Sequence, residues 1–430
     1  MAEKPIQCLY GTKDILPWES PLWRRLEAAA HNIFQRAGYC EIRTPIFEYT
    51  ELFVKGTGEN TDIVQKEMYT FASGEDSTVT LRPEGTPPVV RALIQHDLHK
   101  KQGFWKLYYM GPMFRRERPQ KGRQRQFHQI GAEAIGSPSP LLDAEVIGIA
   151  ASILSEFGLA GFNIKVNCIG CPQCRPAFRD ALKQYFIRHK NNLCDDCKAR
   201  LDRNVLRLLD CKNHPCKTIA ETAPCLGDYL CSDCTSHYDT MKSGLDMLDV
   251  EWHEENRLVR GLDYYTRTVF EITHAALGAR DAVCGGGRYD NLVEDLGGPS
   301  LPAVGFAIGA EATLLAYAET NKDAPLPPEQ QLDVYVVALN DQARPFCFRV
   351  TNLLRKNGIS ADMDYESRSL KAQMRTANKL NTALAAVIGD TEIRAESVNL
   401  KDMRTGQAEL VPLGELIKRI RMLMGKGSDK

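Results

Sequence analysis

Apolar and polar residues recur with two different periods along the chain, and the changes of period mark its predicted elements. In residues 20–38, apolar side chains return at helical spacing, with proline at the first helical position and glycine at the end. Residues 140–157 carry the same helical signals and end before a glycine. By contrast, residues 106–114 and 126–136 are rich in aromatic and branched residues at strand spacing. These last two segments are predicted to be strands joined by a charged loop.

Shorter signals complete the first three quarters of the chain. Residues 41–53 form a strand-like run that a proline interrupts, and two prolines open a predicted helix within residues 82–95. Gly285–Gly287 is interpreted as a turn, which either brings the backbone close to a substrate or is a plain tight turn. The remaining predictions are strands at residues 78–81, 267–275 and 283–291, and a strand followed by a helix at residues 303–319.

The last hundred residues follow a proline-rich linker at residues 321–331 and alternate between strand and helix signals. Strands are predicted at residues 332–339 and 383–389, and helices at residues 345–359, 369–380 and 415–423. This alternation is typical of an α/β module with a mostly parallel sheet.

Composition and charge narrow the function classes. The 430 residues suffice for two or three domains, and 43% hydrophobic with 25% charged residues is ordinary for a globular protein. The net charge of −1 gives no overall attraction to nucleic acid, so such binding requires a local patch. The N-terminus has no apolar signal region, and no run of eighteen apolar residues occurs. We therefore expect a cytoplasmic protein with no membrane partner.

Cysteines are concentrated in one segment, since ten of the 14 lie between Cys168 and Cys234. In a reducing compartment this favours metal ligation over disulfides. Two C-x-x-C pairs nineteen residues apart match the spacing of a four-thiolate zinc site, and four further cysteines would form a second one. The alternative is a set of buried, inert thiols. The predicted first group is Cys171, Cys174, Cys194 and Cys197, the second is Cys211, Cys216, Cys231 and Cys234, and Cys168 and Cys225 are left over.

The loop Arg115–Arg125 carries six positive charges and one negative charge between its two predicted strands. Guanidinium groups at this density can bind a triphosphate or a nucleic-acid end. The alternative is a solvated, charged hairpin.

The motifs in and around this loop carry a family resemblance. Phe114-Arg115-x-Glu117, Arg123-x-x-x-Phe127 and then Glu133 resemble motif 2 of the class II aminoacyl-tRNA synthetases. The segments RPQKGRQRQFHQIG (118–131) and VRGLDYYTRTVFEI (259–272) resemble motifs of the histidyl-tRNA synthetase family in particular. The resemblance implies an α+β fold in three parts. They are a catalytic domain with an antiparallel sheet flanked by helices (1–167 and 249–325), a Cys-rich helical insertion (168–248) and an α/β anticodon-binding domain (332–430).

The same resemblance implies ligation of L-histidine to tRNA(His) through a histidyl-adenylate, with ATP and Mg²⁺, by a homodimer whose motif 1 lies in residues 41–53. It assigns Glu84, Thr86 and Gln129 to the amino group of histidine, and Glu133, Tyr264 and Tyr265 to its ring. It assigns ATP to Arg115, Glu117, Arg123 and Phe127, with Arg115 and Arg260 as the catalytic pair on the α-phosphate. Arg260 would also hold the carboxylate of histidine.

One position departs from the family pattern. Motif 3 places an arginine after its glutamate, but here Glu311 is followed by Ala312. Either Arg123 or Arg125 compensates for the missing charge, or activation is weak. Two other hypotheses remain: a synthetase-like regulatory subunit of histidine biosynthesis that binds histidine, and a tRNA-binding protein without catalysis.

Overall fold

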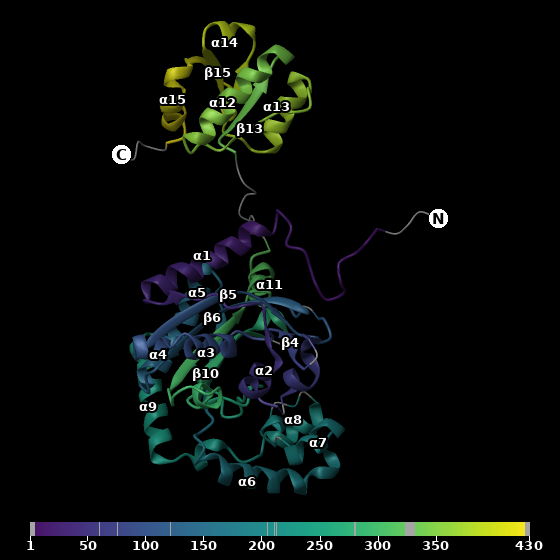
Figure 1. Cartoon of the computed structure of the whole chain (residues 1–430), viewed down its shortest axis with the longest axis vertical. Coiled ribbons are helices and arrows are strands. Elements are labelled where there is room, and N and C mark those ends of the chain that lie inside the picture. The colour runs from purple at the N-terminus through teal and green to yellow at the C-terminus, as the bar shows by residue number, and fades with distance from the viewer. Residues whose placement is uncertain are drawn as a thin grey trace. The chain divides into compact units, whose positions relative to one another are not determined.

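The computed structural model describes residues 5–59, 61–74, 76–120, 122–203, 205–209, 211, 213–278, 281–322 and 332–425. The chain divides into two compact units, Met1–Ala324 and Pro325–Lys430 (Figure 1). Residues 323–331, which hold most of the predicted linker, lie outside the described residues. None of the described helices has the length and apolar character that a membrane crossing requires.

The first unit is built on an eight-stranded sheet whose six inner strands are all antiparallel. In spatial order the strands are β1 (Cys40–Glu41), β5 (Trp105–Phe114), β6 (Gln126–Ile135), β11 (Ala303–Gly309), β10 (Ala282–Arg288), β9 (Thr266–His274), β7 (Phe162–Cys168) and β8 (His253–Glu254). The two short edge strands, β1 and β8, pair in parallel with their neighbours. The hairpin β5–β6 confirms the two strands predicted on either side of the charged loop.

Because side chains alternate along a strand, the two faces of this sheet bury different clusters. Tyr108 packs on one face with α1 (Ser20–Arg36), α5 (Pro140–Phe157) and α11 (Ala310–Thr320). Tyr109 packs on the other face with α3 (Thr86–Gln95) and the short α10 (Leu292–Asp295). Figure 1 shows α1 and α5 on one side of β5 and β6, with α2 (Thr50–Thr57) and α3 on the other.

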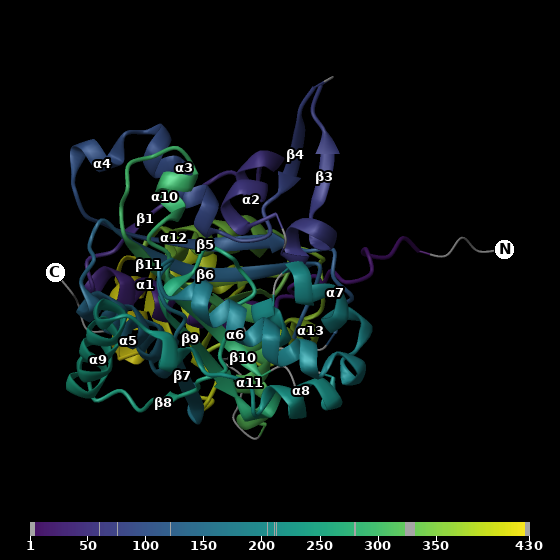
Figure 2. The same cartoon turned by 90° about the horizontal axis from the view of Figure 1, so that it is seen from below.

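A smaller antiparallel sheet adjoins the second face, in the order β2 (Phe47–Tyr49), β4 (Thr78–Leu81) and β3 (Tyr69–Ala72). Figure 2 shows β3 and β4 projecting from the body. The strand-like run predicted over residues 41–53 is wrong in part, because its end forms the helix α2 (Thr50–Thr57). A one-turn π-helix (Ile63–Glu67) and the short helix α4 (Leu98–Lys101) complete this side.

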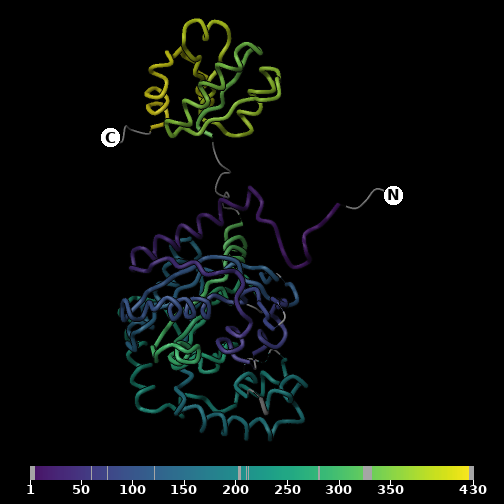
Figure 3. The backbone as a smooth tube through the Cα atoms, in the orientation of Figure 1, coloured from purple at the N-terminus to yellow at the C-terminus, as the bar shows by residue number. Residues whose placement is uncertain are grey.

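The Cys-rich insertion is helical, as predicted. Its helices are α6 (Arg175–Arg188), α7 (Asp195–Arg203), α8 (His214–Ala220) and α9 (Ser232–Met247), with 3-10 turns at Lys190–Asn192, Val205–Leu208 and Leu226–Tyr229. The segment leaves the eight-stranded sheet after β7 and returns through α9, which packs on α5 (Figure 3). It has a buried cluster of its own, which includes Phe178, Leu182 and Phe186.

The second unit is a five-stranded sheet in the order β13 (Ala361–Met363), β12 (Val334–Ala338), β14 (Leu384–Ile388), β15 (Ser397–Asp402) and β16 (Ala408–Pro412). The first three strands are parallel and the last two antiparallel. Its helices are α12 (Arg344–Lys356), α13 (Leu370–Lys379), α14 (Asp390–Arg394) and α15 (Leu416–Leu423). The prediction captured β12 and β14 but missed β13 and the β15–β16 hairpin.

Candidate active site

A buried carboxylate marks the first part of the site. Glu84 lies between β4 and α3 and is 4% exposed. The hydroxyl of Thr57 donates a hydrogen bond of 2.5 Å to one of its oxygens, and the hydroxyl of Tyr264 donates one of 2.8 Å to the other. Burial raises the pKa of Glu84, while the bonds from Thr57 and Tyr264 and the charge of Arg115 oppose that shift. The ring of Tyr265 lies beside that of Tyr264, with centroids 4.7 Å apart.

A second buried carboxylate lies nearby on β6. Glu133 is 1% exposed and accepts a hydrogen bond of 2.7 Å from the hydroxyl of Thr86, the first residue of α3. Its other oxygen accepts one from the hydroxyl of Tyr289, which follows β10. Burial raises the pKa of Glu133 to about 8, although both hydroxyl bonds favour the ionised form. The site therefore holds two buried carboxyl groups, each hydrogen-bonded by two hydroxyl groups.

Two glycines leave space for the ring of Tyr109, which packs beside these carboxyl groups. A Cβ atom at Gly85 would lie 2.2 Å from the ring of Tyr109, and one at Gly131 would lie 2.3 Å from it. Neither glycine has a positive φ, so the requirement is one of space. Larger residues at these positions would displace Tyr109 from the face that carries Glu133.

Gln129 shares that face with Glu133, because four residues along a strand return to the same side. Its side-chain oxygen is buried and has no hydrogen-bond partner among the described residues. A buried acceptor without a partner is costly unless a ligand supplies the donor. This oxygen therefore points to a ligand with an N–H group.

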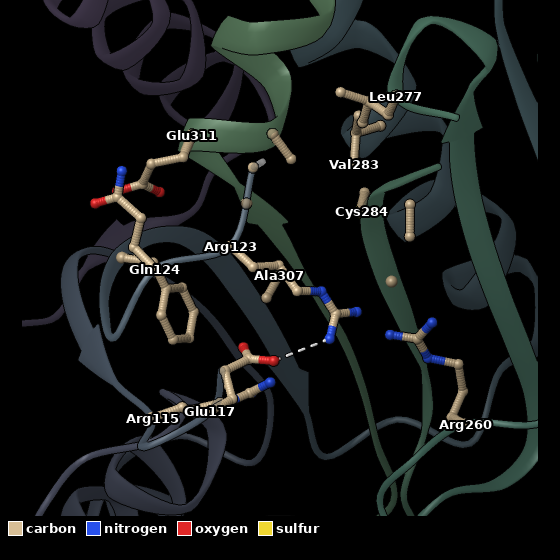
Figure 4. Close-up of a pocket in the computed structure, with 16 residues that line it drawn as sticks. Arg115, Glu117, Arg123, Gln124, Arg260, Leu277, Val283, Cys284, Ala307 and Glu311 are labelled. Atoms are coloured by element: carbon tan, nitrogen blue, oxygen red, sulfur yellow. Dashed lines mark hydrogen bonds and ion pairs between the residues drawn. The ribbon is translucent and has the colours of Figure 1, made fainter. Parts of the chain in front are cut away.

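The third part is a cavity that carries the positive charge of the site (Figure 4). Its polar lining is Arg115, Glu117, Arg123, Gln124, Arg260 and Glu311, and its apolar lining includes Phe127, Leu277, Val283, Ala307 and Ala312. Figure 4 shows the guanidinium groups of Arg123 and Arg260 directed toward each other across it. The cavity thus brings together all five residues that the sequence predicts for ATP and the α-phosphate.

Neighbouring groups fix these arginines. Arg115 donates to the carbonyl of Pro83 at 2.9 Å, and its guanidinium carbon lies 5.2 Å from the ring centroid of Phe127. Arg123 forms an ion pair of 3.2 Å with Glu117, and Arg260 forms one with Glu271. Arg115 therefore links the cavity to the strand end that leads into Glu84.

Comparisons with known proteins agree with this geometry. Residues 11–313 match the family model described as histidyl-tRNA synthetase. The chain belongs to the histidyl-tRNA synthetase family. This confirms the predicted family and the class II fold. Residues 333–423 match the model of an anticodon binding domain.

Individual members of the family match almost the whole chain. The histidine–tRNA ligase of Halothermothrix orenii is 48% identical over 414 residues, covering 96% of this chain and 98% of that protein. The histidine–tRNA ligase of Caldanaerobacter subterraneus subsp. tengcongensis is 46% identical over 411 residues, with the same coverage. The crystal structure of apo histidyl-tRNA synthetase from S. aureus is 38% identical with a TM-score of 0.81, covering 97% of this chain and 100% of that one.

The departure from the family's motif 3 is visible at the cavity. Ala312 lines the wall, while Glu311 accepts hydrogen bonds from the backbone N–H of His128 at 2.9 Å and from its ring. Arg125 does not take the missing position, because it donates to the carbonyl of Tyr10 at 3.2 Å and lies over the ring of that residue. Of the two candidates, Arg123 is therefore the one that can compensate for the missing motif 3 arginine, because it lines the cavity.

Several site residues were missed by the sequence reasoning. Tyr289 holds Glu133, Thr57 holds Glu84 and Glu271 pairs with Arg260. The only sequence signal for Tyr289 is its place at the end of the glycine-rich strand. The predicted turn at Gly285–Gly287 is wrong: these glycines lie within β10, and a Cβ atom at Gly285 would lie 2.0 Å from the guanidinium of Arg260.

The clustered cysteines form two groups, but not those that the spacing predicts. The outer cluster is Cys171, Cys174, Cys231 and Cys234, and the inner cluster is Cys194, Cys197, Cys211 and Cys216. In each, all four sulfur atoms lie within 4.8 Å of one another. The predicted group of Cys171, Cys174, Cys194 and Cys197 is therefore wrong. The chain folds back on itself, so Cys171 and Cys174 meet Cys231 and Cys234, and the inner cluster lies between these two pairs in the sequence.

Proposed function

We propose that this chain ligates L-histidine to tRNA(His) in two steps, with the family's chemistry carried by its own residues. In the first step histidine and ATP give histidyl-adenylate and pyrophosphate, and in the second the aminoacyl group passes to the 3′ end of the tRNA. The observation that carries the proposal is the adjacency of two parts: a buried, hydroxyl-supported pair of carboxylates, Glu84 and Glu133, and a cavity with three arginines.

Histidine binds in the part built around the carboxylates. Its ammonium group donates to Glu84, Thr86 and the partnerless oxygen of Gln129. Its imidazole ring offers one donor and one acceptor, which Glu133 and the hydroxyl of Tyr265 satisfy. Tyr264 acts through Glu84, because its hydroxyl already donates to that carboxylate. A site that hydrogen-bonds both ring nitrogens rejects analogues that lack one of them by roughly ten-thousand-fold.

ATP binds in the cavity, with its adenine stacked on Phe127 and contacted by Glu117, and its terminal phosphates on Arg123. The carboxylate of histidine attacks the α-phosphorus, an oxygen–phosphorus bond forms, and the bond to the pyrophosphate oxygen breaks. The nucleophile is already an anion, so no side chain has to remove a proton. Arg115 and Arg260 hold the charge that grows on the α-phosphate, and this electrostatic work is the main catalytic contribution.

Mg²⁺ is part of the proposal because it accompanies the phosphates of ATP. In such sites Mg²⁺ is bound by one or two carboxylates, phosphate oxygens and water, and the cavity offers Glu311 in its wall. Bound there, it would neutralise phosphate charge. The positioning of histidine and the α-phosphate still rests on the side chains described above.

A homodimer in the cytoplasm completes the proposal. The three-stranded sheet exposes Phe47, Tyr49 and Phe71, with Ile46 beside them, and exposed aromatic residues gathered on one sheet favour a protein contact. We place the dimer contact on this sheet, and the tRNA anticodon on the unit that contains β12–β16. The regulatory-subunit alternative is disfavoured, because the chain retains both Arg260 in the cavity and this second unit.

Histidine-dependent exchange of pyrophosphate into ATP tests the first step, and charging of tRNA(His) tests the second. We expect both activities, and absence of exchange at saturating substrates would overturn the proposal. Arg115→Ala and Arg260→Ala are each expected to lower the exchange rate by at least roughly a hundredfold, since each removes a charged donor at the α-phosphate. Arg36→Ala, at an exposed arginine that ends α1, is the matched control. Near-full exchange in either cavity variant would contradict the roles given to them.

A further inference from the structure

The outer and inner clusters take no part in the chemistry proposed above, yet they gather eight of the chain's cysteines. The 14 cysteines are all free thiols. Cys171 and Cys231, in the outer cluster, are half-buried, while Cys174 and Cys234 are buried. Simple packing does not require four sulfur atoms to converge, because Leu or Val would fill the same space without a reactive group. Convergence of this kind calls for a common ligand.

The sulfur geometry matches a tetrahedral zinc ion. Zn–S bonds of about 2.3 Å place the four sulfurs of a tetrahedral site about 3.8 Å apart. In the outer cluster the Sγ atom of Cys171 lies 3.6 Å from that of Cys174 and 4.0 Å from that of Cys231. In the inner cluster the Sγ atoms of Cys194 and Cys211 are 3.8 Å apart. These three distances are close to the spacing that zinc requires, and the remaining sulfur pairs of each cluster lie within 4.8 Å.

Backbone groups support the same sulfurs. The N–H of Cys231 donates to the Sγ of Cys174 at 3.1 Å, and the N–H of Cys194 donates to the Sγ of Cys216 at 3.2 Å. Such bonds orient metal ligands and stabilise their negative charge. Each cluster also contains at least one C-x-x-C pair, in which two ligands come from one short turn.

We propose that the insertion binds two zinc ions, one in the outer cluster and one in the inner cluster. The inner zinc would hold the start of α7 to the start of α8. The outer zinc would join the start of α6 to the start of α9, which are the two ends of the insertion. Because the insertion has only about eighty residues, a metal supplies stability that its small core lacks.

The outer cluster also adjoins the segment that carries Tyr265. The N–H of Ile169 donates to the carbonyl of Arg267 at 2.7 Å, and the N–H of Arg267 donates to that of Gly170 at 2.9 Å. Arg175, next to Cys174, donates to the carbonyl of Tyr265. The outer zinc therefore holds in place the segment before β9. Loss of that zinc should raise the KM for histidine, a consequence that rests on the proposed function.

Metal analysis of the untagged, full-length protein tests the sites without reference to activity. After purification under reducing conditions and dialysis against a weak chelator, we expect two zinc ions per chain. Zinc below half an equivalent would overturn the proposal, as would iron in its place. Exchange of zinc for Co²⁺ in the same protein should give the absorption of two tetrahedral four-thiolate sites, and its absence would also overturn it.

Paired substitutions test which cysteines share an ion. Cys171→Ala with Cys231→Ala removes two ligands of one cluster and should leave one zinc, whereas Cys171→Ala with Cys194→Ala should leave none. The grouping that the spacing alone suggests predicts the reverse, so that result would overturn the assignment. Cys225→Ala, in the insertion but outside both clusters, is the control and should retain two zinc ions. If a variant does not fold, the absorption of the Co²⁺-substituted wild-type protein still shows whether the two sites exist.

Discussion

At the scale of single residues, the most informative group is the carboxyl of Glu133, whose pKa burial raises to about 8 from a usual value of 4.5. Between these values the folded chain keeps a proton that the unfolded chain has lost. Stability therefore falls as the pH rises through this window. The glutamine of Glu133→Gln does not titrate, so this contribution to the unfolding free energy changes with pH in the wild type alone. The unfolding free energy of the variant minus that of the wild type should therefore increase across the window and level off above about pH 8.

Urea unfolding at a series of pH values measures this difference. Glu27→Gln, at an exposed position of α1, controls for the loss of a carboxylate elsewhere. A difference that decreases as the pH rises would contradict the burial of an uncharged Glu133. The variant should also lose affinity for histidine, because an amide presents a different donor and acceptor pattern to the imidazole ring.

Ala312 offers a second test at this scale. If Arg123 alone neutralises the terminal phosphates, an arginine at position 312 adds a charge to the same cavity wall. We expect Ala312→Arg to lower the KM for ATP by roughly tenfold, which corresponds to about 1.4 kcal/mol. Steady-state exchange kinetics measure it, with Ala312→Leu as the control for size without charge.

The two arginines should also be redundant. Arg123→Ala is expected to cost less in the Ala312→Arg background than in the wild type, and the double-mutant cycle gives the difference. Equal costs in both backgrounds would show that the two arginines act independently, and no cost in either would show that Arg123 does not reach the phosphates.

At the scale of elements, the close approach of α3 to β5 is a packing constraint that a single methyl group tests. A Cβ atom at Gly85 would lie 2.2 Å from the ring of Tyr109, inside its van der Waals surface. Gly85→Ala should therefore destabilise the protein by about 1–3 kcal/mol and raise the KM for histidine. Thermal unfolding and exchange kinetics measure the two effects. Gly103→Ala, where nothing lies within 4 Å of the added methyl group, is the matched control, and equal effects of the two would refute the constraint.

The elements also show how far sequence reasoning reaches. Periodicity predicted α1, α5 and the β5–β6 hairpin, because each has a strong local pattern. The family resemblance predicted the residues around the cavity, because its motifs can be matched position by position to this sequence. Contacts between distant segments left no such signal: the role of Tyr289 and the meeting of Cys171 and Cys174 with Cys231 and Cys234 both depend on them. Cysteine spacing was equally compatible with sequential and enclosed grouping.

At the scale of the whole molecule, each unit has its own hydrophobic core. Buried residues of α1, α5 and the eight-stranded sheet form one core, and those of β12, β14 and α12 form another. The unit Met1–Ala324 contains every residue proposed for activation. A chain ending at Ala324 should therefore retain histidine-dependent exchange. Its rate of charging tRNA(His) should fall by roughly a hundredfold or more, because the covalent link to the second unit supplies that unit's tRNA contacts at a millimolar effective concentration.

Single-turnover transfer from preformed histidyl-adenylate separates these effects, because it does not depend on activation. Adding the second unit, Pro325–Lys430, as a separate protein at micromolar concentration should leave charging low, since the covalent link provides the effective concentration. Restored charging under these conditions would contradict the role of the linkage. Loss of exchange in the shortened chain would instead show that activation depends on the second unit, and would overturn the assignment of all activation residues to the first.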